Sequence, residues 1–215
     1  LTEEYDGTSW SGGGNMIIGR SYYLGNSGTQ NAAKAFGGNT FPSNKMTSTE
    51  DYNGTAWSAT TCMNVGRSAL GSSQNGTQNS TLAFGGYTSS PTCLASSCVE
   101  SWNGSSWSTE TTIPDGYGFG QGAGTSDIDA LRVGGYTYPT NISNVVQQYD
   151  GITWSRCSSV LVPMHYNSGA GSSASPLSFG KRTPIGAGTY AATSTIDQRG
   201  AGLNSFAASV VFETE

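Results

Sequence analysis

Tyr149-Asp150-Gly151-Ile152-Thr153-Trp154 is the last of four copies of one short phrase in this chain. Each copy reads aromatic, Asp or Asn, Gly, two further residues, then Trp. The other copies occupy residues 5–10, 52–57 and 102–107. The spacings between their tryptophans are 47, 50 and 47 residues. A period in this range predicts one supersecondary unit repeated along the chain, so the repeat decides the fold.

A second marker recurs with the same period. It is a short apolar run that ends in Phe or Val followed by glycine, at residues 36–38, 84–86, 133–135 and 179–181. The last copy has lost its second glycine, because Lys181 follows Gly180. Asp-Gly or Asn-Gly before each Trp predicts a hairpin with a type I′ turn. Together these signals predict about four short strands in each unit of about 48 residues, and no stretch has a helical period.

Four-stranded units of this length are typical of β-propeller blades. We therefore expect an all-β protein, a small propeller of four to five blades, with the tryptophans in the core between neighbouring blades. Residues 1–215 form one domain in this prediction. The repeat boundaries lie near residues 11, 58, 108 and 155, and a degenerate segment, 183–215, closes the ring.

The two markers together resemble the kelch-like family, in which Gly-Gly follows an apolar strand and a Trp follows a turn. Residues 2–10, and Gly28-Thr29-Gln30 leading into Ala35-Phe36-Gly37-Gly38, look more closely like the Gly/Thr-rich kelch-like repeats of phage structural proteins. The resemblance covers about residues 1–181. It implies a kelch-like propeller on a phage tail, fibre or capsid surface, whereas a fold by itself does not fix a function.

Closure of the ring has several solutions in the sequence. In the first, strands at 160–181 pair with residues 1–10 and give four blades. In the second, residues 193–203, of which 193–200 echo residues 47–54, end a fourth blade, and a last strand at 209–215 joins residues 1–10 in a fifth. We favour five blades, because the last segment has strand character and needs an edge. Closure by another copy of the chain is a third solution.

Composition narrows the function classes. The 215 residues include 31 glycines, and only 11% of residues are charged, with a net charge of −5. The nine basic residues are scattered, which argues against nucleic-acid binding. The longest apolar run, residues 160–164, is too short to insert into a membrane. We expect no cofactor.

Candidate chemistry is sparse, so we predict no catalytic residues and no enzyme. The single histidine, His165, falls close to the repeat position of Arg20 and Arg67. Asp127-Ile128-Asp129 offers two carboxylates to Ca²⁺, but an exposed strand edge explains them better, so no metal site is predicted. Cys93 and Cys98 are close enough for a loop disulfide, and free thiols are equally consistent with the spacing.

The loops after the glycine pairs are the best candidate sites, because they vary most between repeats. They span residues 39–46, 87–97, 136–143 and 181–192. Aromatic side chains with Asn, Ser and Thr can stack on sugars and hydrogen bond with them. Packing against the blades or against a neighbouring subunit explains the same residues. The candidate ligand-binding residues are Phe41, Tyr87, Tyr136, Tyr138, Asn141 and Tyr190.

The resemblance to phage structural proteins, together with the sparse chemistry, implies a non-enzymatic virion protein on the particle surface, or otherwise extracellular. Its partners would be other virion proteins, copies of itself or host-surface glycans. The alternatives are a secreted carbohydrate-binding lectin with equivalent pockets, and a subunit of an extracellular filament.

Overall fold

The computed structural model describes residues 1–21, 24–40, 44–89, 95–137, 141–186 and 189–198. Every regular element in these ranges is a strand, which confirms the all-β class. Three four-stranded antiparallel sheets follow one another along the chain, and we name them sheets 1, 2 and 3. Sheet 1 consists of β3 (Gly25–Thr29), β4 (Ala32–Phe36), β7 (Thr49–Tyr52) and β8 (Trp57–Thr60). Sheet 2 consists of β10 (Gly71–Ser72), β11 (Thr81–Phe84), β13 (Val99–Trp102) and β14 (Trp107–Thr109). Sheet 3 consists of β15 (Gln121–Ala123), β16 (Ala130–Val133), β19 (Val146–Tyr149) and β20 (Trp154–Arg156).

The two ends of the chain add smaller sheets. Sheet 4 has the order β21 (Ser168–Gly171), β22 (Pro176–Gly186) and β23 (Thr189–Gln198). The N-terminal hairpin is β1 (Thr2–Tyr5) paired with β2 (Trp10–Gly13). Short pairs also follow the glycine motifs: β5 (Asn39–Thr40) with β6 (Asn44–Lys45), β9 (Arg67–Ser68) with β12 (Tyr87–Thr88), and β17 (Tyr136–Thr137) with β18 (Asn141–Ile142).

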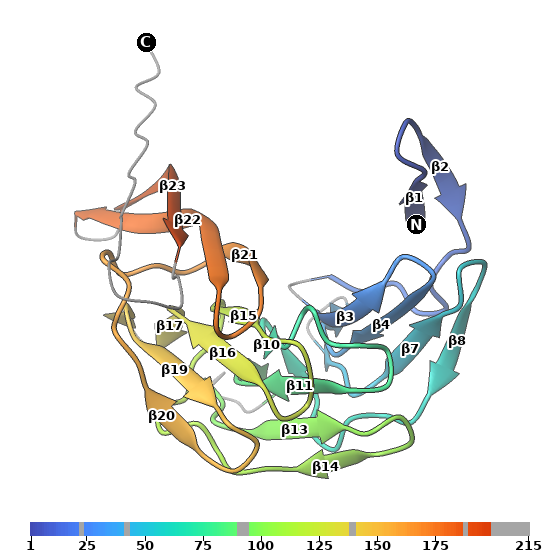
Figure 1. Cartoon of the computed structure of the whole chain (residues 1–215), viewed down its shortest axis with the longest axis horizontal. Coiled ribbons are helices and arrows are strands. Elements are labelled where there is room, and N and C mark those ends of the chain that lie inside the picture. Colours follow the sequence, from blue (N-terminus) through green and yellow to red (C-terminus); the bar gives the residue numbers. More distant parts are fainter. Residues whose placement is uncertain (22–23, 41–43, 90–94, 138–140, 187–188, 199–215) are drawn as a thin grey trace.

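The sheets are arranged along an arc (Figure 1). The first strands β3, β10, β15 and β21 lie toward the inside, and each contacts the next. The last strands β8, β14 and β20 lie on the outside. The N-terminal hairpin and sheet 4 stand on the two sides of the open part of the arc. The predicted repeat boundaries fall inside β2, β8, β14 and β20, so each sheet ends within a few residues of its boundary.

The repeated Asp-Gly or Asn-Gly forms the hairpin turn, but the turn is not of type I′. Asn53 accepts hydrogen bonds at Oδ1 from the backbone N–H groups of Thr55 (3.0 Å) and Ala56 (2.9 Å). Asp6, Asn103 and Asp150 do the same in the other copies. Only the glycine of each turn has a positive φ, between 88° and 100°. The side-chain oxygen replaces a backbone acceptor, so one left-handed residue is enough.

The glycine pairs connect each sheet to the next unit. The Gly38 N–H donates to the carbonyl of Arg67 (2.9 Å), and the Gly86 N–H donates to Tyr117 (2.6 Å) in the same way. A Cβ at Gly37 would lie 2.7 Å from the Arg67 carbonyl oxygen. Positive φ and this close approach explain why glycine stands at both positions.

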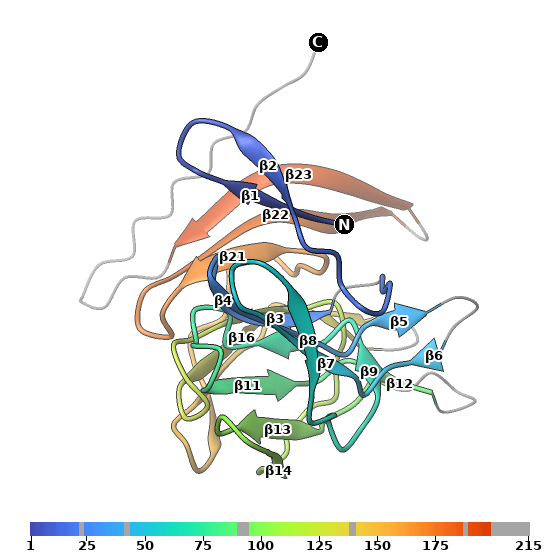
Figure 2. The ribbon, with the colours of Figure 1, turned by 90° about the vertical axis from the view of Figure 1, so that its right-hand side faces the viewer.

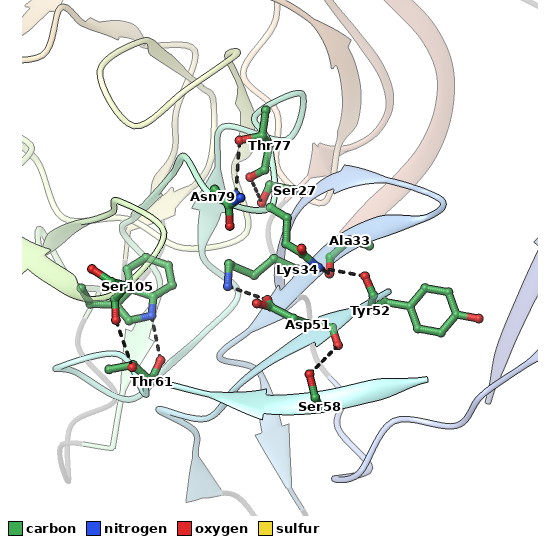
Figure 3. Close-up of polar contacts among 12 residues, drawn as sticks. Ser27, Ala33, Lys34, Asp51, Tyr52, Ser58, Thr61, Thr77, Asn79 and Ser105 are labelled. Atoms are coloured by element: carbon green, nitrogen blue, oxygen red, sulfur yellow. Dashed lines mark hydrogen bonds and ion pairs between the residues drawn. The ribbon is translucent and has the colours of Figure 1, made fainter. Parts of the chain in front are cut away.

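A loop from sheet 2 also reaches over sheet 1. The Gln78 amide donates to the backbone carbonyls of Ala33 (3.0 Å) and Tyr52 (2.8 Å). The Ser27 hydroxyl donates to the Thr77 carbonyl at 3.1 Å, a second contact between the same two sheets (Figure 3). Neighbouring sheets are therefore tied by polar contacts to main-chain atoms as well as by apolar packing.

Aromatic pairs fill the space between sheets. The ring of Phe36 in sheet 1 meets Trp107 in sheet 2 with centroids 5.0 Å apart, and Phe84 in sheet 2 meets Trp154 in sheet 3 at 5.2 Å. These tryptophans, like Trp102, are buried. The prediction that the repeat tryptophan packs between units is correct for these sheets.

The first tryptophan is the exception. Trp10 is 69% exposed, and its neighbour Tyr5 is 44% exposed. Trp57 is half-buried. The prediction that all tryptophans belong to the core is therefore wrong for Trp10, because no described sheet covers the hairpin on that side.

Residues 193–198, the described part of the predicted segment 193–203, pair with β22, as expected for the end of a fourth blade. β22 pairs with β23 and not with the N-terminal hairpin, so within the described ranges the four-blade closure does not form. Ile196 lies opposite Phe179, where sheet 1 places Thr49 opposite Phe36. The sequence echo had aligned Ile196 with Glu50, so it is wrong by one residue. The predicted last strand at 209–215 lies outside the described residues.

Candidate functional site

The loops after the glycine pairs lie on one side of the sheets. Figure 2 shows β5, β6, β9 and β12 projecting together from that side. Here the backbone N–H and carbonyl of Gly118 bond to Tyr136 at 3.0 and 2.7 Å, as those of Ser21 bond to Asn39 at 2.9 Å. The same loop end therefore recurs from unit to unit.

Three residues at this end have an unusual backbone conformation. Ala69, Phe119 and Tyr166 have φ values of 54°, 55° and 57°, and no other non-glycine residue in the described ranges has a positive φ. They occupy the same repeat position in consecutive units. Left-handed conformations are disfavoured for bulky side chains, so Phe119 and Tyr166 carry backbone strain.

Backbone hydrogen bonds connect these three residues. The Phe119 N–H donates to the carbonyl of Ala69 (3.0 Å), and the Tyr166 N–H donates to the carbonyl of Phe119 (2.8 Å). We name this chain of bonds the inner ladder. It fixes the position of each side chain relative to the next unit, which is how the strained conformation is held.

The inner ladder presents a continuous group of rings, which we name the mouth cluster. Its members are Tyr87, Phe119, Tyr136, His165 and Tyr166. Centroid distances are 5.1 Å for Tyr87 and Phe119, 4.4 Å for Phe119 and Tyr166, 4.6 Å for His165 and Tyr166, and 5.7 Å for Tyr136 and His165. The cluster joins three consecutive units.

Packing beneath the cluster is tight. Tyr87 is buried, and its hydroxyl donates to the carbonyl of Tyr136 at 3.2 Å. A Cβ at Gly118 would overlap the Tyr87 ring, so only glycine fits there. His165 is also buried, whereas Phe119, Tyr136 and Tyr166 are half-buried. The solvent-facing part of the cluster therefore belongs to these three aromatic rings.

The predicted site residues have different outcomes. Tyr87 and Tyr136 lie in the mouth cluster. Asn141 is exposed in β18, and its carbonyl accepts a bond from the Thr137 hydroxyl at 3.3 Å. Tyr190 pairs through its backbone with Pro184. Phe41 and Tyr138 lie outside the described residues.

Sequence reasoning missed Phe119 and Tyr166. The residue two positions after Arg20 is Tyr22, and the residue two positions after Arg67 is Ala69, so the residue type at this repeat position varies and marks no site by itself. Met164, whose carbonyl accepts from Gly135 (2.8 Å), takes the place of Arg67 in the fourth unit. His165 was predicted to lie close to the repeat position of Arg20 and Arg67. It lies one residue after that position.

Buried charges lie between the sheets and away from the mouth cluster. Arg67 bonds to Glu100 at 2.7 Å with both side chains almost fully buried, and Arg20 pairs with Glu50 in the same way. Burial lowers the pKa of Arg67, while the nearby Glu100 opposes that shift. These carboxylates are bound to cations and to backbone N–H groups, so they are structural.

Sheet 3 replaces this ion pair by another arrangement. Tyr117 and Gln147 stand at the positions of Arg67 and Glu100, and the cation comes from Arg132 on β16. The Arg132 guanidinium lies 4.0 Å from the Tyr117 ring centroid and donates to Gln147 Oε1 at 2.7 Å. Burial lowers the pKa of Arg132 and raises the pKa of Tyr117.

The calcium hypothesis finds no support in the geometry. The Asp127 carboxylate accepts from Ser80 (2.6 Å), and Asp129 accepts from Thr125 and Ser173. The two carboxylates are thus engaged with different units. No group of three metal-binding side chains occurs among the described residues.

Two further predictions concern cysteines and membranes. Cys62, Cys98 and Cys157 are free thiols, so Cys98 forms no loop disulfide, and Cys93 lies outside the described residues. Within the described ranges, no helix has the length and apolar character of a membrane span.

Comparison with known proteins does not assign the chain to a family. No protein-family model matches it, and no curated protein is significantly similar to it.

Proposed function

We propose that this chain is a kelch-like β-propeller of four to five blades that acts, without catalysis, as a structural and adhesion protein on the surface of a phage particle. In this proposal the mouth cluster binds a saccharide of the host surface. Other faces make assembly contacts with virion proteins or with copies of the chain.

Support for the propeller comes from the sheets. Sheets 1 to 3 have the same strand order, and their first strands contact one another along the inside of the arc. Radial repetition of four-stranded sheets is the defining arrangement of a propeller. The kelch-like phrase in the sequence supports the same fold and, by resemblance, a place on a phage particle.

The observation that carries saccharide binding is the strained presentation of Phe119 and Tyr166. Both rings are half-buried, and both backbones are held at positive φ by the inner ladder. Strained residues concentrate at ligand sites, and a rigid aromatic surface suits stacking against a sugar ring. Ala69 at the same position shows that the backbone does not need an aromatic side chain there.

The test is a glycan array followed by titration of the best ligand. Phe119→Ala and Tyr166→Ala should each weaken binding about twofold to tenfold, because an aromatic contact contributes about 0.5–1.5 kcal/mol beyond its area. Ile152→Ala, at an exposed turn, is the matched control and should leave binding unchanged. If both aromatic variants bind as the unmodified chain does, the mouth cluster is not the site.

The place on a particle needs its own test. Mass spectrometry of purified phage particles from the source should detect this chain. Its absence from particles, combined with glycan binding by the soluble chain, would favour a secreted lectin. The same repeat position holds Ala69 in one unit and Phe119 in the next. This difference argues against the equivalent pockets expected of such a lectin.

A further inference from the structure

No described strand lies along one edge of β1, at a place where each of sheets 1 to 4 has a strand. β1 corresponds to β7, β13 and β19, the third strands of sheets 1 to 3. Each of these pairs on both sides, for example β7 with β4 and with β8. Among the described residues β1 pairs only with β2, so no described strand occupies its second edge.

Hydrogen-bond alternation identifies the free groups. The Asp6 N–H donates to the Ser9 carbonyl at 3.1 Å and closes the hairpin. Backbone groups of alternate residues in a strand point to opposite edges. Because Asp6 faces β2, the N–H and carbonyl groups of Tyr5 and of Glu3 point away from β2. These groups are the template for an added strand.

Trp57 lies beside this edge, and in the described structure it lacks the phenylalanine contact that Trp107 and Trp154 make. The Trp57 indole donates to Thr2 Oγ1 at 2.9 Å, which places it next to the start of β1. Trp107 and Trp154, its equivalents, are buried under Phe36 and Phe84. Trp57 is only half-buried, and no described phenylalanine ring packs on it. A phenyl ring opposite Thr2 would complete the same contact.

The register of sheet 1 shows which strand fits. Phe36 lies opposite Thr49, the equivalent of Thr2. Lys34 lies opposite Asp51, the equivalent of Glu4, and the two form an ion pair of 2.5 Å. A strand with Phe at one end, a small residue next and a basic residue third therefore matches β1. The basic residue of such a strand also offsets the negative charge of Glu3 and Glu4.

We infer that β1 is the docking edge for an extended strand of another polypeptide, with a basic residue opposite Glu4 and a phenyl ring over Trp57. The second strands of this chain are already engaged, since β4, β11, β16 and β22 each pair with a third strand of their own sheet. This surface is separate from the mouth cluster, so the inference does not depend on saccharide binding.

The probe is a fluorescent peptide that copies residues 31–38, Asn-Ala-Ala-Lys-Ala-Phe-Gly-Gly. Fluorescence polarisation with the full chain should give saturable binding. Replacing Phe36 by Ser in the peptide should weaken binding at least tenfold, because the phenyl contact with Trp57 is lost. Replacing Lys34 by Glu should weaken it as well, with the larger effect at low salt.

Two protein variants distinguish pairing at the β1 edge from nonspecific peptide binding. Glu3→Pro removes an N–H that faces the free edge and should weaken peptide binding at least tenfold. Glu3→Ala keeps that N–H and should bind within about threefold of the unmodified chain. Circular dichroism checks that both variants keep their strands.

Hydrogen exchange supplies the deciding measurement. The amides of Glu3 and Tyr5 should exchange fast in the free chain and become protected when the peptide binds. Equal peptide binding by Glu3→Pro and Glu3→Ala would overturn the inference. Protection of both amides without peptide would overturn it too, because the edge would then be filled by the chain itself.

Discussion

Replacing Glu100 by Gln tests the buried ion pair between the sheets. The Glu100 carboxylate accepts from the Arg67 guanidinium (2.7 Å) and from the backbone N–H groups of Asn64 (2.6 Å) and Val65 (3.3 Å). Gln has nearly the same volume as Glu but no charge. Its NH2 group would face the N–H donors that now bond to the Glu100 carboxylate. The guanidinium would remain buried without a counter-charge, although it still donates to Gly85 and other carbonyls.

The expected loss in the free energy of unfolding is about 3–5 kcal/mol, because breaking a buried pair leaves an uncompensated charge. Both side chains are at most 1% exposed, so solvent screening does not reduce this value. Urea denaturation followed by tryptophan fluorescence measures the loss. Circular dichroism should give a coincident transition, which is needed to treat unfolding as two-state.

Sheet 3 provides the matched control. Gln147 stands at the position of Glu100, and its Oε1 already accepts from Arg132 at 2.7 Å. Gln147→Glu adds the missing counter-charge, so we expect the stability to rise or to change by less than about 1 kcal/mol. A loss below about 1 kcal/mol for Glu100→Gln, or an equal loss in both variants, would refute the reasoning that Glu100 is needed to compensate the buried charge of Arg67.

Three further predictions follow from the packing and the turns. Trp107→Ala should cost about 3–5 kcal/mol in urea denaturation, whereas Trp10→Ala, at an exposed position, should cost less than about 1. Gly122→Ala should cost about 1–3 kcal/mol or prevent folding, because its Cβ would meet the backbone of β10; a neutral result would contradict the close approach of β15 and β10. The pKa values of Asp6 and Asp150 are lowered, chiefly by hydrogen bonds from the backbone N–H groups of the turn. The two carboxylates therefore stabilise the fold above the unfolded-state pKa of about 4, and this stabilisation is lost as the pH falls below that value. Replacing both by Asn, which already serves at this position in the other two turns, should flatten the acid limb of the stability profile measured by thermal unfolding between pH 2 and 7.

The repeat and its strands could be predicted because their signals are local. Asp-Gly and Asn-Gly mark the turn, and the glycine pair marks the end of the second strand. The turn type could not be predicted from the dipeptide alone. It depends on whether the Asn53 side chain accepts the backbone N–H groups, and that choice leaves Gly54 as the one residue with positive φ.

Burial could be predicted for an average unit but not for the first one. Trp10 and Trp107 stand in the same phrase, yet one is exposed and the other buried. The difference comes from neighbouring sheets, which a repeat pattern treats as equal. The one-residue error at Ile196 has a similar origin, because a sequence echo ignores which residue lies opposite Phe179.

The candidate site was found only in part. Tyr87 and Tyr136 were predicted because they follow the glycine pairs. Phe119 and Tyr166 were missed because the residue type at their repeat position varies. Their common property is a backbone conformation, and only the structure reveals that the same position is left-handed in three units.

The open arc has a consequence for how the chain loses its structure. Sheets 2 and 3 each have a sheet on both sides, whereas sheet 4 and the N-terminal hairpin each contact one neighbour along the described chain. In repeat proteins the stability is close to a sum of unit and interface contributions, so terminal units with a single interface melt first. We expect hydrogen exchange and limited proteolysis to advance from both ends inward, with sheets 2 and 3 protected longest. A partner that fills an end would then raise the melting temperature of the whole chain, because it would remove a place where unravelling starts.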